Sequence, residues 1–260
     1  MGHRMRQVIL GILATGVVVG ATHGTIVWDA GADWSIGNGN PNGAWTYGSA
    51  DYLSPGVTVD VGTFTPFALA KTAADYKDFP PDPPTPANPA TLEIWQDNDL
   101  DPNANSNRAA TDYNAFGITF VSNRVNLSPA NGPVTLARWT APSAGLYDIA
   151  AEFFNVQGFA DDIYVYIAGA QVFASRSPDS KSVLVGTPYS TTGVALNAGD
   201  AVFFGVGNFY YTNNTGLEAI ITRIPEPASS MLLGLATLLG ARFRRHRAYS
   251  RCIGVHRGQS

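Results

Sequence analysis

Between residues 25 and 224, hydrophobic and polar residues follow the period of β-strands. Residues 57–61, 117–121 and 163–167 are rich in β-branched and aromatic side chains, and Gly, Pro, Asn or Asp bound each of them. No stretch in this region combines the helical period of about 3.6 residues with helix-forming residues over the length of a typical helix. The pattern therefore predicts short strands and no long helix.

Turn-forming residues separate the predicted strands at short intervals. Clusters of Asn, Pro, Gly and Asp lie at 40–43, 131–133, 142–145, 197–200 and 213–216. Many short strands without intervening helices predict an all-β fold, namely an antiparallel β-sandwich of jelly-roll type in a single domain over residues 25–224. The six prolines at 80–89 lack backbone donors, so we expect that segment to be an exposed loop within this domain.

The N-terminal segment, residues 1–24, has the layout of a secretory signal peptide. Two arginines precede an uncharged apolar run at 8–20, and Ala21 or Gly24 supplies a small residue for cleavage. A short membrane anchor is the alternative, but about 13 helical residues reach only about 20 Å across a hydrocarbon core of about 30 Å. We therefore expect the protein to be exported.

The C-terminal segment, residues 225–260, contains three features in a fixed order. Pro225, Glu226 and Pro227 come first, and an apolar run at 228–241 follows, which we predict to be a helix. An arginine cluster then holds the far end of that helix on the cytoplasmic side. The cluster consists of Arg242, Arg244, Arg245 and Arg247.

This order resembles the PEP-CTERM sorting signal of Gram-negative bacteria. The resemblance implies that an exosortase, a membrane cysteine protease, recognises the tail and that processing falls near Pro225, Glu226 and Pro227. It also implies that the inner membrane and the secretion machinery hold the protein only transiently, before it reaches the cell surface or the extracellular matrix. A plain single-pass C-terminal anchor is the alternative.

Charge and residue types then limit the chemistry of the body. Residues 25–224 contain 19 acidic and 8 basic residues, a net charge of −11, so we expect no nucleic-acid partner. All four histidines and the one cysteine of the chain lie outside this range. The body therefore cannot form a Ser-His-Asp or Cys-His catalytic set or a His/Cys zinc site. Carboxylate chemistry and the binding of hard cations remain.

An acidic cluster follows the predicted strand at 92–95. Alternating carboxylates in a short turn provide several of the six to eight oxygen ligands that calcium takes, so this cluster predicts a calcium site. The predicted ligands are Asp97, Asp99, Asp101 and Asn103. The EF-hand pattern is not met, because Pro102 replaces the turn glycine and Arg108 occupies the place of the closing Glu. A solvated acidic loop is the ordinary interpretation of such a cluster, and calcium binding is the functional alternative to it.

Aromatic residues provide a second type of site. A flat ring face beside Asn or Asp suits a sugar ring, which has an apolar face and polar edges. Trp34, Trp45 and Tyr47 lie among Gly and Asn residues rather than in a regular strand pattern, so we expect them to be exposed and to bind a ligand. The alternative for each ring is burial in the core of the sandwich.

Four sequence segments of the body resemble those of a group of PEP-CTERM surface proteins whose jelly-roll domain is similar to carbohydrate-binding modules. They lie at 40–48, 138–147, 196–200 and 215–220. The segment at 138–147 fits a strand, a turn and a second strand, and we expect the rings of Trp139 and Tyr147 to lie in the core. The resemblance implies a fold and a location at the cell surface, but no defined activity.

These observations predict a non-enzymatic exported protein with a structural role in the envelope or in exopolysaccharide. A carbohydrate-binding module that contacts exopolysaccharide, with structural calcium, is the alternative. A glycoside hydrolase is a more remote one, because it requires paired carboxylates such as Glu152 and Glu218, and glutamates at such strand positions ordinarily serve solubility.

Overall fold

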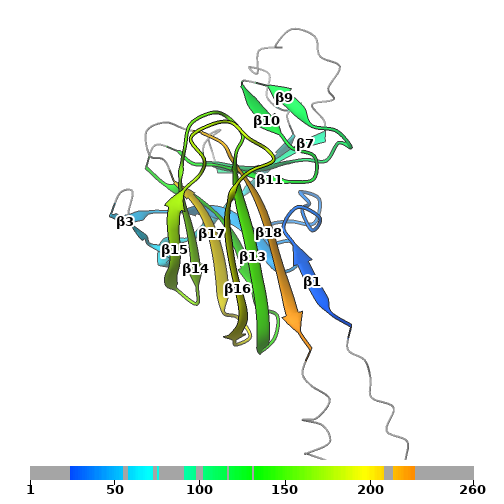
Figure 1. The fold of residues 1–260 in the computed structure, drawn as a ribbon. Helices are drawn as coiled ribbons and strands as arrows, with labels where there is room; N and C mark the ends of the chain where they lie inside the picture. The colour runs from blue at the N-terminus through cyan, green and yellow to red at the C-terminus, as the bar shows by residue number, and fades with distance from the viewer. Residues whose placement is uncertain are drawn as a thin grey trace, which may run out of the picture. The chain divides into compact units, whose positions relative to one another are not determined.

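Two antiparallel β-sheets form the body of the protein in the computed structural model (Figure 1). The structure describes residues 24–54, 58–72, 75, 91–97, 102–115, 117–130, 132–207 and 213–225. Residues Thr25–Pro225 make up one compact unit. The predicted all-β fold with antiparallel sheets is confirmed for the described residues, in which the one helical element is a short 3-10 turn, η1 (Val61–Thr63).

The strands divide between two large sheets, which we call sheet A and sheet B. Sheet A has the order β16-β13-β18-β11-β8-β7-β6, and β1 also pairs with β18. Its strands are β1 (Ile26–Asp29), β6 (Leu69–Thr72), β7 (Leu92–Gln96), β8 (Asn103–Asn107), β11 (Val125–Ser128), β13 (Gly145–Asn155), β16 (Thr187–Leu196) and β18 (Thr215–Ile224). Sheet B has the order β15-β14-β17-β12-β2-β5. Its strands are β2 (Trp45–Ala50), β5 (Thr65–Pro66), β12 (Val134–Thr140), β14 (Asp162–Ile167), β15 (Ala170–Arg176) and β17 (Ala201–Gly207).

Most consecutive strands in the second half of the chain change sheet. The chain passes from β12 in sheet B to β13 in sheet A and back to β14, and it repeats such crossings from β15 to β18. The turns predicted at 142–145 and 197–200 lie at two of these crossings. This alternation between facing sheets is consistent with a jelly-roll sandwich.

Sheet A divides where β18 meets two different neighbours. The first residues of β18 pair with β11, with Leu217 opposite Val125, and its last residues pair with β1, with Arg223 opposite Ile26. The two ends of the described chain therefore leave the same end of the same sheet (Figure 1). After β1, the chain must cross from sheet A to β2 in sheet B, and this crossing builds the pocket described below.

Side chains from both sheets fill the space between them. Trp139 on β12 and Tyr147 on β13 are fully buried, and their ring centroids are 5.2 Å apart with an edge-on orientation. The Tyr147 hydroxyl donates to the carbonyl of Ser143, at 2.6 Å, so its one polar group is satisfied within the turn. The core positions predicted for Trp139 and Tyr147 are confirmed.

Short elements cover part of the outer face of each sheet. The hairpin of β9 (Tyr113–Ala115) and β10 (Ile118–Phe120) packs with Leu92 and Phe154 of sheet A. The hairpin of β3 (Tyr52–Ser54) and β4 (Thr58–Val59), together with η1, lies beside Leu136 and Phe203 of sheet B. Because of these hairpins, each sheet makes apolar contacts on its outer face as well as on the face that packs against the other sheet.

A buried carboxyl group, that of Asp161, lies at the start of β14 and contacts the start of β18. Asp161 precedes β14, and its Oδ2 accepts a hydrogen bond of 2.6 Å from the Thr215 hydroxyl. Its backbone N–H donates to the hydroxyl of Ser177. Burial raises the pKa of Asp161 to about 7, although hydrogen bonds from Thr215 and Asn213 oppose the shift.

Several predictions fall on residues outside the described ranges. They are the signal peptide at 1–24, except Gly24, the proline-rich loop at 80–89, the apolar helix at 228–241 and the arginine cluster at 242–247. Within the described ranges, no helix has the length and apolar character needed to cross a membrane.

Candidate functional site

The chain between β1 and β2, residues 30–44, folds into a loop that is held by its own polar side chains. Asp29 begins it, because its Oδ1 accepts hydrogen bonds from the N–H groups of Gly31 and Ala32, at 2.9 and 3.1 Å. This is the local bonding that makes Asp a turn residue. Gly31 has no side chain where the loop passes the carbonyl of Asn123, and a Cβ there would collide with that oxygen.

The end of the loop is fixed in a similar way. The backbone groups of Asn42 and Trp45 bond to each other across Gly43, whose φ of 57° favours glycine. The Asn42 side chain donates to the carbonyl of Asp33, which joins the two arms of the loop. Asn40, which precedes a cis proline, bonds through its side chain to both backbone groups of Tyr47.

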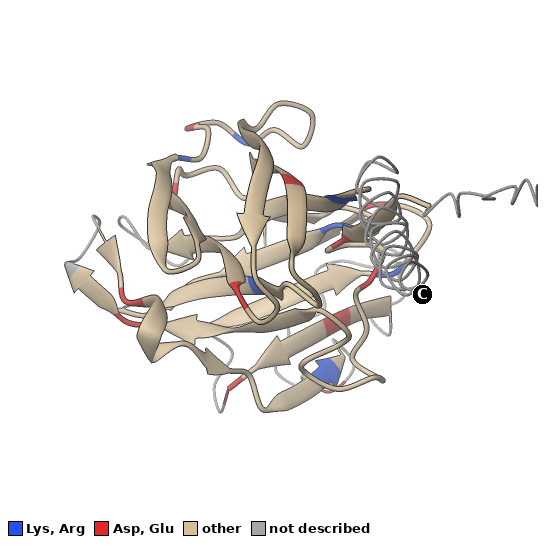
Figure 2. Cartoon of the chain, turned by 90° about the horizontal axis from the view of Figure 1, so that it is seen from below, with Lys and Arg blue, Asp and Glu red and all other residues tan. Residues whose placement is uncertain are grey.

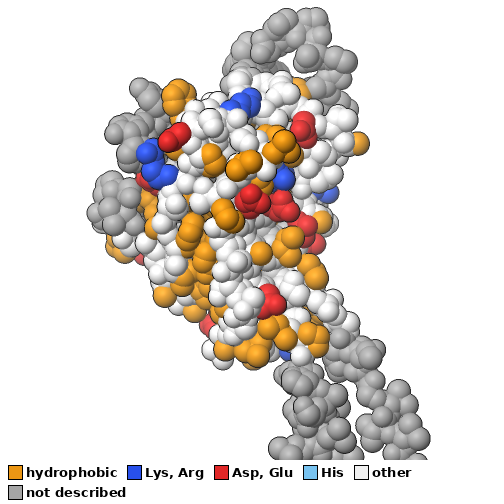
Figure 3. Space-filling model, in the orientation of Figure 1, with side chains coloured by type: hydrophobic (Ala, Val, Ile, Leu, Met, Phe, Trp, Pro, Cys, Tyr) orange, Lys and Arg blue, Asp and Glu red, His pale blue; other side chains and the backbone are white. Residues whose placement is uncertain are grey.

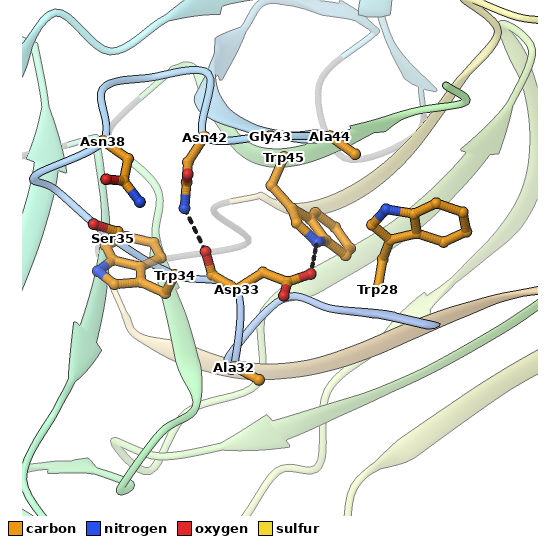
Figure 4. A pocket seen from close by; sticks show the side chains of 10 residues that line it. All are labelled: Trp28, Ala32, Asp33, Trp34, Ser35, Asn38, Asn42, Gly43, Ala44 and Trp45. Carbon is orange, nitrogen blue, oxygen red and sulfur yellow. Dashed lines mark hydrogen bonds between the residues drawn. The ribbon is translucent and has the colours of Figure 1, made fainter. Parts of the chain in front are cut away.

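These two arms border an open pocket of about 410 Å³ between β1 and β2 (Figure 4). Its volume lies within the range of about 300–1,000 Å³ that is usual for small-molecule sites. Trp28, Ala32, Asp33, Trp34, Ser35, Asn38, Asn42, Gly43, Ala44 and Trp45 line it. In the view of Figure 4, the rings of Trp28 and Trp45 lie on one side of Asp33, and Trp34, Ser35 and Asn38 lie on the other.

Asp33 connects the walls of the pocket. Its Oδ2 accepts hydrogen bonds from the indole Nε1–H of Trp45, at 3.3 Å, and from the backbone N–H of Asp29, at 3.1 Å. Within the described part of the chain, its Oδ1 has no hydrogen-bond partner. Asp33 is half-buried, so this oxygen is a ready acceptor for a group that enters the pocket.

The exposure predicted for the three aromatic residues is wrong. Trp34, Trp45 and Tyr47 are 3%, 0% and 1% exposed. Tyr47 points into the core, where its hydroxyl donates to the carbonyl of Ala30 and its ring packs on Trp34, with centroids 4.4 Å apart. The Gly and Asn residues around them form the loop that covers the rings rather than a surface that displays them.

Trp34 and Trp45 nevertheless line the pocket, with little ring surface open to solvent. The indole Nε1–H of Trp34 is buried and has no acceptor among the described residues. Trp28 is half-buried, and it packs edge-on against Trp139 with centroids 5.2 Å apart. Trp28 is therefore the ring with the most surface to offer a ligand.

The sequence did not single out the polar half of this site. Asp33, Ser35, Asn38 and Asn42 belong to a Gly- and Asn-rich segment that reads as a simple loop. The alternation of Trp with Asn and Asp between residues 28 and 45 was the available signal, because a binding loop needs both ring surface and short polar side chains.

The electrostatic character of the site is negative. Burial, followed by the nearby carboxylates of Asp33 and Asp29, raises the pKa of Tyr47 far above its usual value, while Arg108 lowers it. Arg108 is half-buried and donates from Nη1 to the carbonyl of Gly31, at 2.6 Å. The cation thus supports the loop backbone and does not line the pocket.

The residues predicted to bind calcium are only partly described. Asp97 is exposed after β7, and Asn103 is buried at the start of β8, where its Oδ1 accepts from the side chain of Asn105 at 2.9 Å. Asp99 and Asp101 lie outside the described residues. The described ranges contain no group of three His, Cys, Asp or Glu residues that could hold a metal ion.

Glu152 and Glu218 lie directly opposite each other on β13 and β18. Glu218 forms an ion pair with Arg124, at 3.1 Å, and Glu152 accepts a hydrogen bond from the N–H of Gly186, at 3.0 Å. Acidic side chains gather near the middle of the face shown in Figure 3. Both glutamates thus have structural partners.

Of the predicted sorting residues, Pro225 is described, and it is exposed directly after β18. Glu226, Pro227, Arg242, Arg244 and Arg245 lie outside the described residues.

Comparison with known proteins gives structural likeness only. No family model and no curated protein matches the chain. Among solved structures, a family 35 carbohydrate-binding module from Clostridium thermocellum shares 14% identity, with a TM-score of 0.28 over 37% of this chain and 76% of that one. A CBM36-1 domain of a multidomain xylanase from the hindgut metagenome of Trinervitermes trinervoides shares 12% identity, with a TM-score of 0.29 over 46% of this chain and 90% of that one. The K3 adhesin domain of Lys-gingipain from Porphyromonas gingivalis shares 15% identity, with a TM-score of 0.27 over 39% and 74%. These low scores assign no ligand to the pocket.

Proposed function

We propose that this protein is a non-catalytic, exported surface protein whose sandwich binds a polysaccharide through the pocket between β1 and β2. The observation that carries the proposal is the lining of this pocket, in which the half-buried ring of Trp28 stands beside Asp33, Asn38 and Asn42, and the buried rings of Trp34 and Trp45 form the walls. Ring surface combined with short hydrogen-bonding side chains matches the apolar faces and hydroxyl edges of a sugar. This proposal adopts the alternative function from the sequence as the main one.

The burial of each side chain indicates its role in the pocket. The rings of Trp34 and Trp45 form rigid walls, since they are almost fully covered. Contacts to sugar hydroxyls then come from Ser35, Asn38 and Asn42, which are half-buried or exposed. The pocket has room for a small part of a chain, so the protein contacts a polysaccharide locally rather than along its length.

Export and sorting belong to the same proposal. They rest on the signal-peptide pattern at 1–24 and on the ordered tail that begins at Pro225, Glu226 and Pro227. β1 begins beside the end of β18, so the segments that precede and follow the body are joined to neighbouring strands. The binding pocket is formed entirely within the compact unit Thr25–Pro225 and does not depend on those segments.

A structural role is the second candidate, and the edge of sheet B favours it. β15 pairs with β14 alone among the described strands, and it carries no charged residue before Arg176. Val172 on this strand is 46% exposed. An edge strand, which has one side without a strand partner, can add the strand of a second chain. Concentration-dependent assembly that Val172→Lys abolishes would support this role.

A glycan array tests the binding function. The full chain should bind a subset of polysaccharides, and Asn38→Ala should weaken that binding because Asn38 lines the pocket and is exposed. Asn197→Ala is the matched control, because it removes the same amide from an exposed turn outside the pocket. Equal binding by the two variants, or no binding by the full chain, would contradict the proposed function.

A further inference from the structure

We propose that the pocket selects saccharides by charge: a sugar with a free amine binds best, a neutral sugar binds less well, and an acidic sugar is rejected. This inference rests on the proposed function and specifies the class of ligand. It follows from the charged groups that line and surround the pocket.

The lining residues contain one charged side chain, and it is the carboxylate of Asp33. The other polar side chains that line the pocket are neutral, namely Ser35, Asn38 and Asn42. Hydroxyl and amide groups bind sugar hydroxyls without regard to charge, but they cannot neutralise a carboxylate or a sulfate on the ligand. An acidic sugar would therefore be desolvated beside Asp33 with no cation to pair with it.

Asp33 itself has an acceptor to offer. Two protein donors use its Oδ2, at 3.1 and 3.3 Å, and they hold the carboxylate in place. Its Oδ1 has no partner within the described residues. An ammonium group on a sugar would form a charge-assisted hydrogen bond there, and such bonds are stronger than those between neutral groups.

The surroundings add to the same preference. Asp29 carries a second carboxylate next to Asp33, and the guanidinium of Arg108 is directed to the carbonyl of Gly31 rather than into the pocket. Residues 25–224 have a net charge of −11. Figure 2 shows more acidic than basic positions along the strands and loops of the body. The field of the whole body thus repels a polyanion before it reaches the pocket.

The test compares three classes of glycan on the full chain. Amine-bearing chitosan oligosaccharides, the same oligosaccharides after N-acetylation, and oligogalacturonates are titrated at low and at high salt, alongside a panel of neutral glucans, mannans and galactans. The free amine should bind about threefold to tenfold more tightly than its acetylated counterpart at low salt, and added salt should reduce this ratio. Oligogalacturonates should not bind.

Two variants assign the selectivity to Asp33. Asp33→Asn keeps an oxygen acceptor for Trp45 but removes the charge, so the ratio of amine to N-acetyl binding should fall to about one, and this ratio is the readout whatever the variant does to the affinity for the neutral sugar. Asp179→Asn is the control, because it removes one charge from an exposed residue outside the pocket, and it should keep the preference.

The outcomes separate the two proposals. Binding of oligogalacturonates as tight as that of the amine, or an unchanged preference in Asp33→Asn, would overturn the charge selectivity and leave the binding function intact. Absence of binding by every glycan in the panel would overturn the binding function and the selectivity with it.

Discussion

The buried carboxyl group of Asp161 makes the stability of the fold depend on pH in a direction opposite to that of most acidic residues. Burial raises the pKa of Asp161 from 3.8 to about 7, and this effect outweighs the opposing hydrogen bonds from Thr215 and Asn213. The folded state therefore keeps a proton on this group up to about pH 7, whereas the unfolded chain releases it near pH 3.8.

The size of the effect follows from this shift. Each pKa unit corresponds to about 1.36 kcal/mol, so a shift of about three units gives at most about 4 kcal/mol. The folded state binds more protons than the unfolded state between the two pKa values, so the free energy of unfolding falls as pH rises through this window. The stabilisation is fully present below pH 3.8 and is lost as pH rises through about 7.

Asp161→Asn tests this reasoning. The amide keeps an oxygen for the Thr215 hydroxyl but cannot ionise. Urea unfolding at about pH 4 and about pH 8 should show that the variant gains up to about 4 kcal/mol relative to the wild type at the higher pH. Comparison of the two pH values cancels any cost of the amide that does not depend on pH. Asp162, whose pKa burial raises and Arg176 lowers, is present in both proteins, so the difference between the variant and the wild type removes most of its contribution.

Asp179→Asn controls for the loss of one negative charge, because Asp179 is exposed. Parallel stability profiles for the wild type and Asp161→Asn across this pH range would refute the reasoning.

Three further predictions concern packing, metal binding and processing. Gly48→Ala should destabilise the fold by about 2 kcal/mol, because a Cβ there would collide with the carbonyl of Thr65 and come within 2.8 Å of the Phe64 ring. The control Gly37→Ala should change stability little, and equal urea midpoints for the two variants would contradict this prediction. A calcium site at the acidic cluster would raise the melting temperature of the full chain in calcium by about 2–4 °C per kcal/mol of binding energy, and Asp99→Asn would abolish the rise. Identical melting in calcium and in chelator would favour a solvated acidic loop. In cells that carry the sorting machinery, the mass of the mature protein should correspond to a chain without residues 1–24 and without the residues beyond Pro225, Glu226 and Pro227. A mass that includes the apolar run 228–241 would indicate a plain membrane anchor.

The sequence predicts the fold well because strands and turns have local signals. The predicted strand at 163–167 lies within β14, and that at 117–121 contains β10, since β-branched and aromatic residues favour strands wherever they pack. The segment at 57–61 is different, because among its described residues Thr58 and Val59 form a short strand and Asp60 then caps η1 by accepting a hydrogen bond from the N–H of Gly62. A side chain that bonds to nearby backbone competes with the ladder there.

The binding site was harder to predict because exposure depends on partners that are distant in sequence. Gly and Asn residues around Trp34 and Trp45 indicate a loop, but they do not reveal that this loop folds back over the rings. Asn42 reaches Asp33 across nine positions, and the Asn40 side chain contacts the carbonyl of Phe67 across 27. Contacts of this kind decide which polar groups face the pocket, and no local pattern encodes them.

The most direct test of the binding function observes the five tryptophan indoles of the protein during titration with the glycan that binds best on the array. Each indole Nε1–H gives its own signal in a proton–nitrogen spectrum, and Trp28 and Trp34 line the pocket, whereas Trp95 lies on β7, outside it. Binding in the pocket predicts that the Trp28 and Trp34 signals shift with increasing glycan while the Trp95 signal stays in place. A titration in which the Trp28 and Trp34 signals do not move, or in which the Trp95 signal alone moves, would contradict the account.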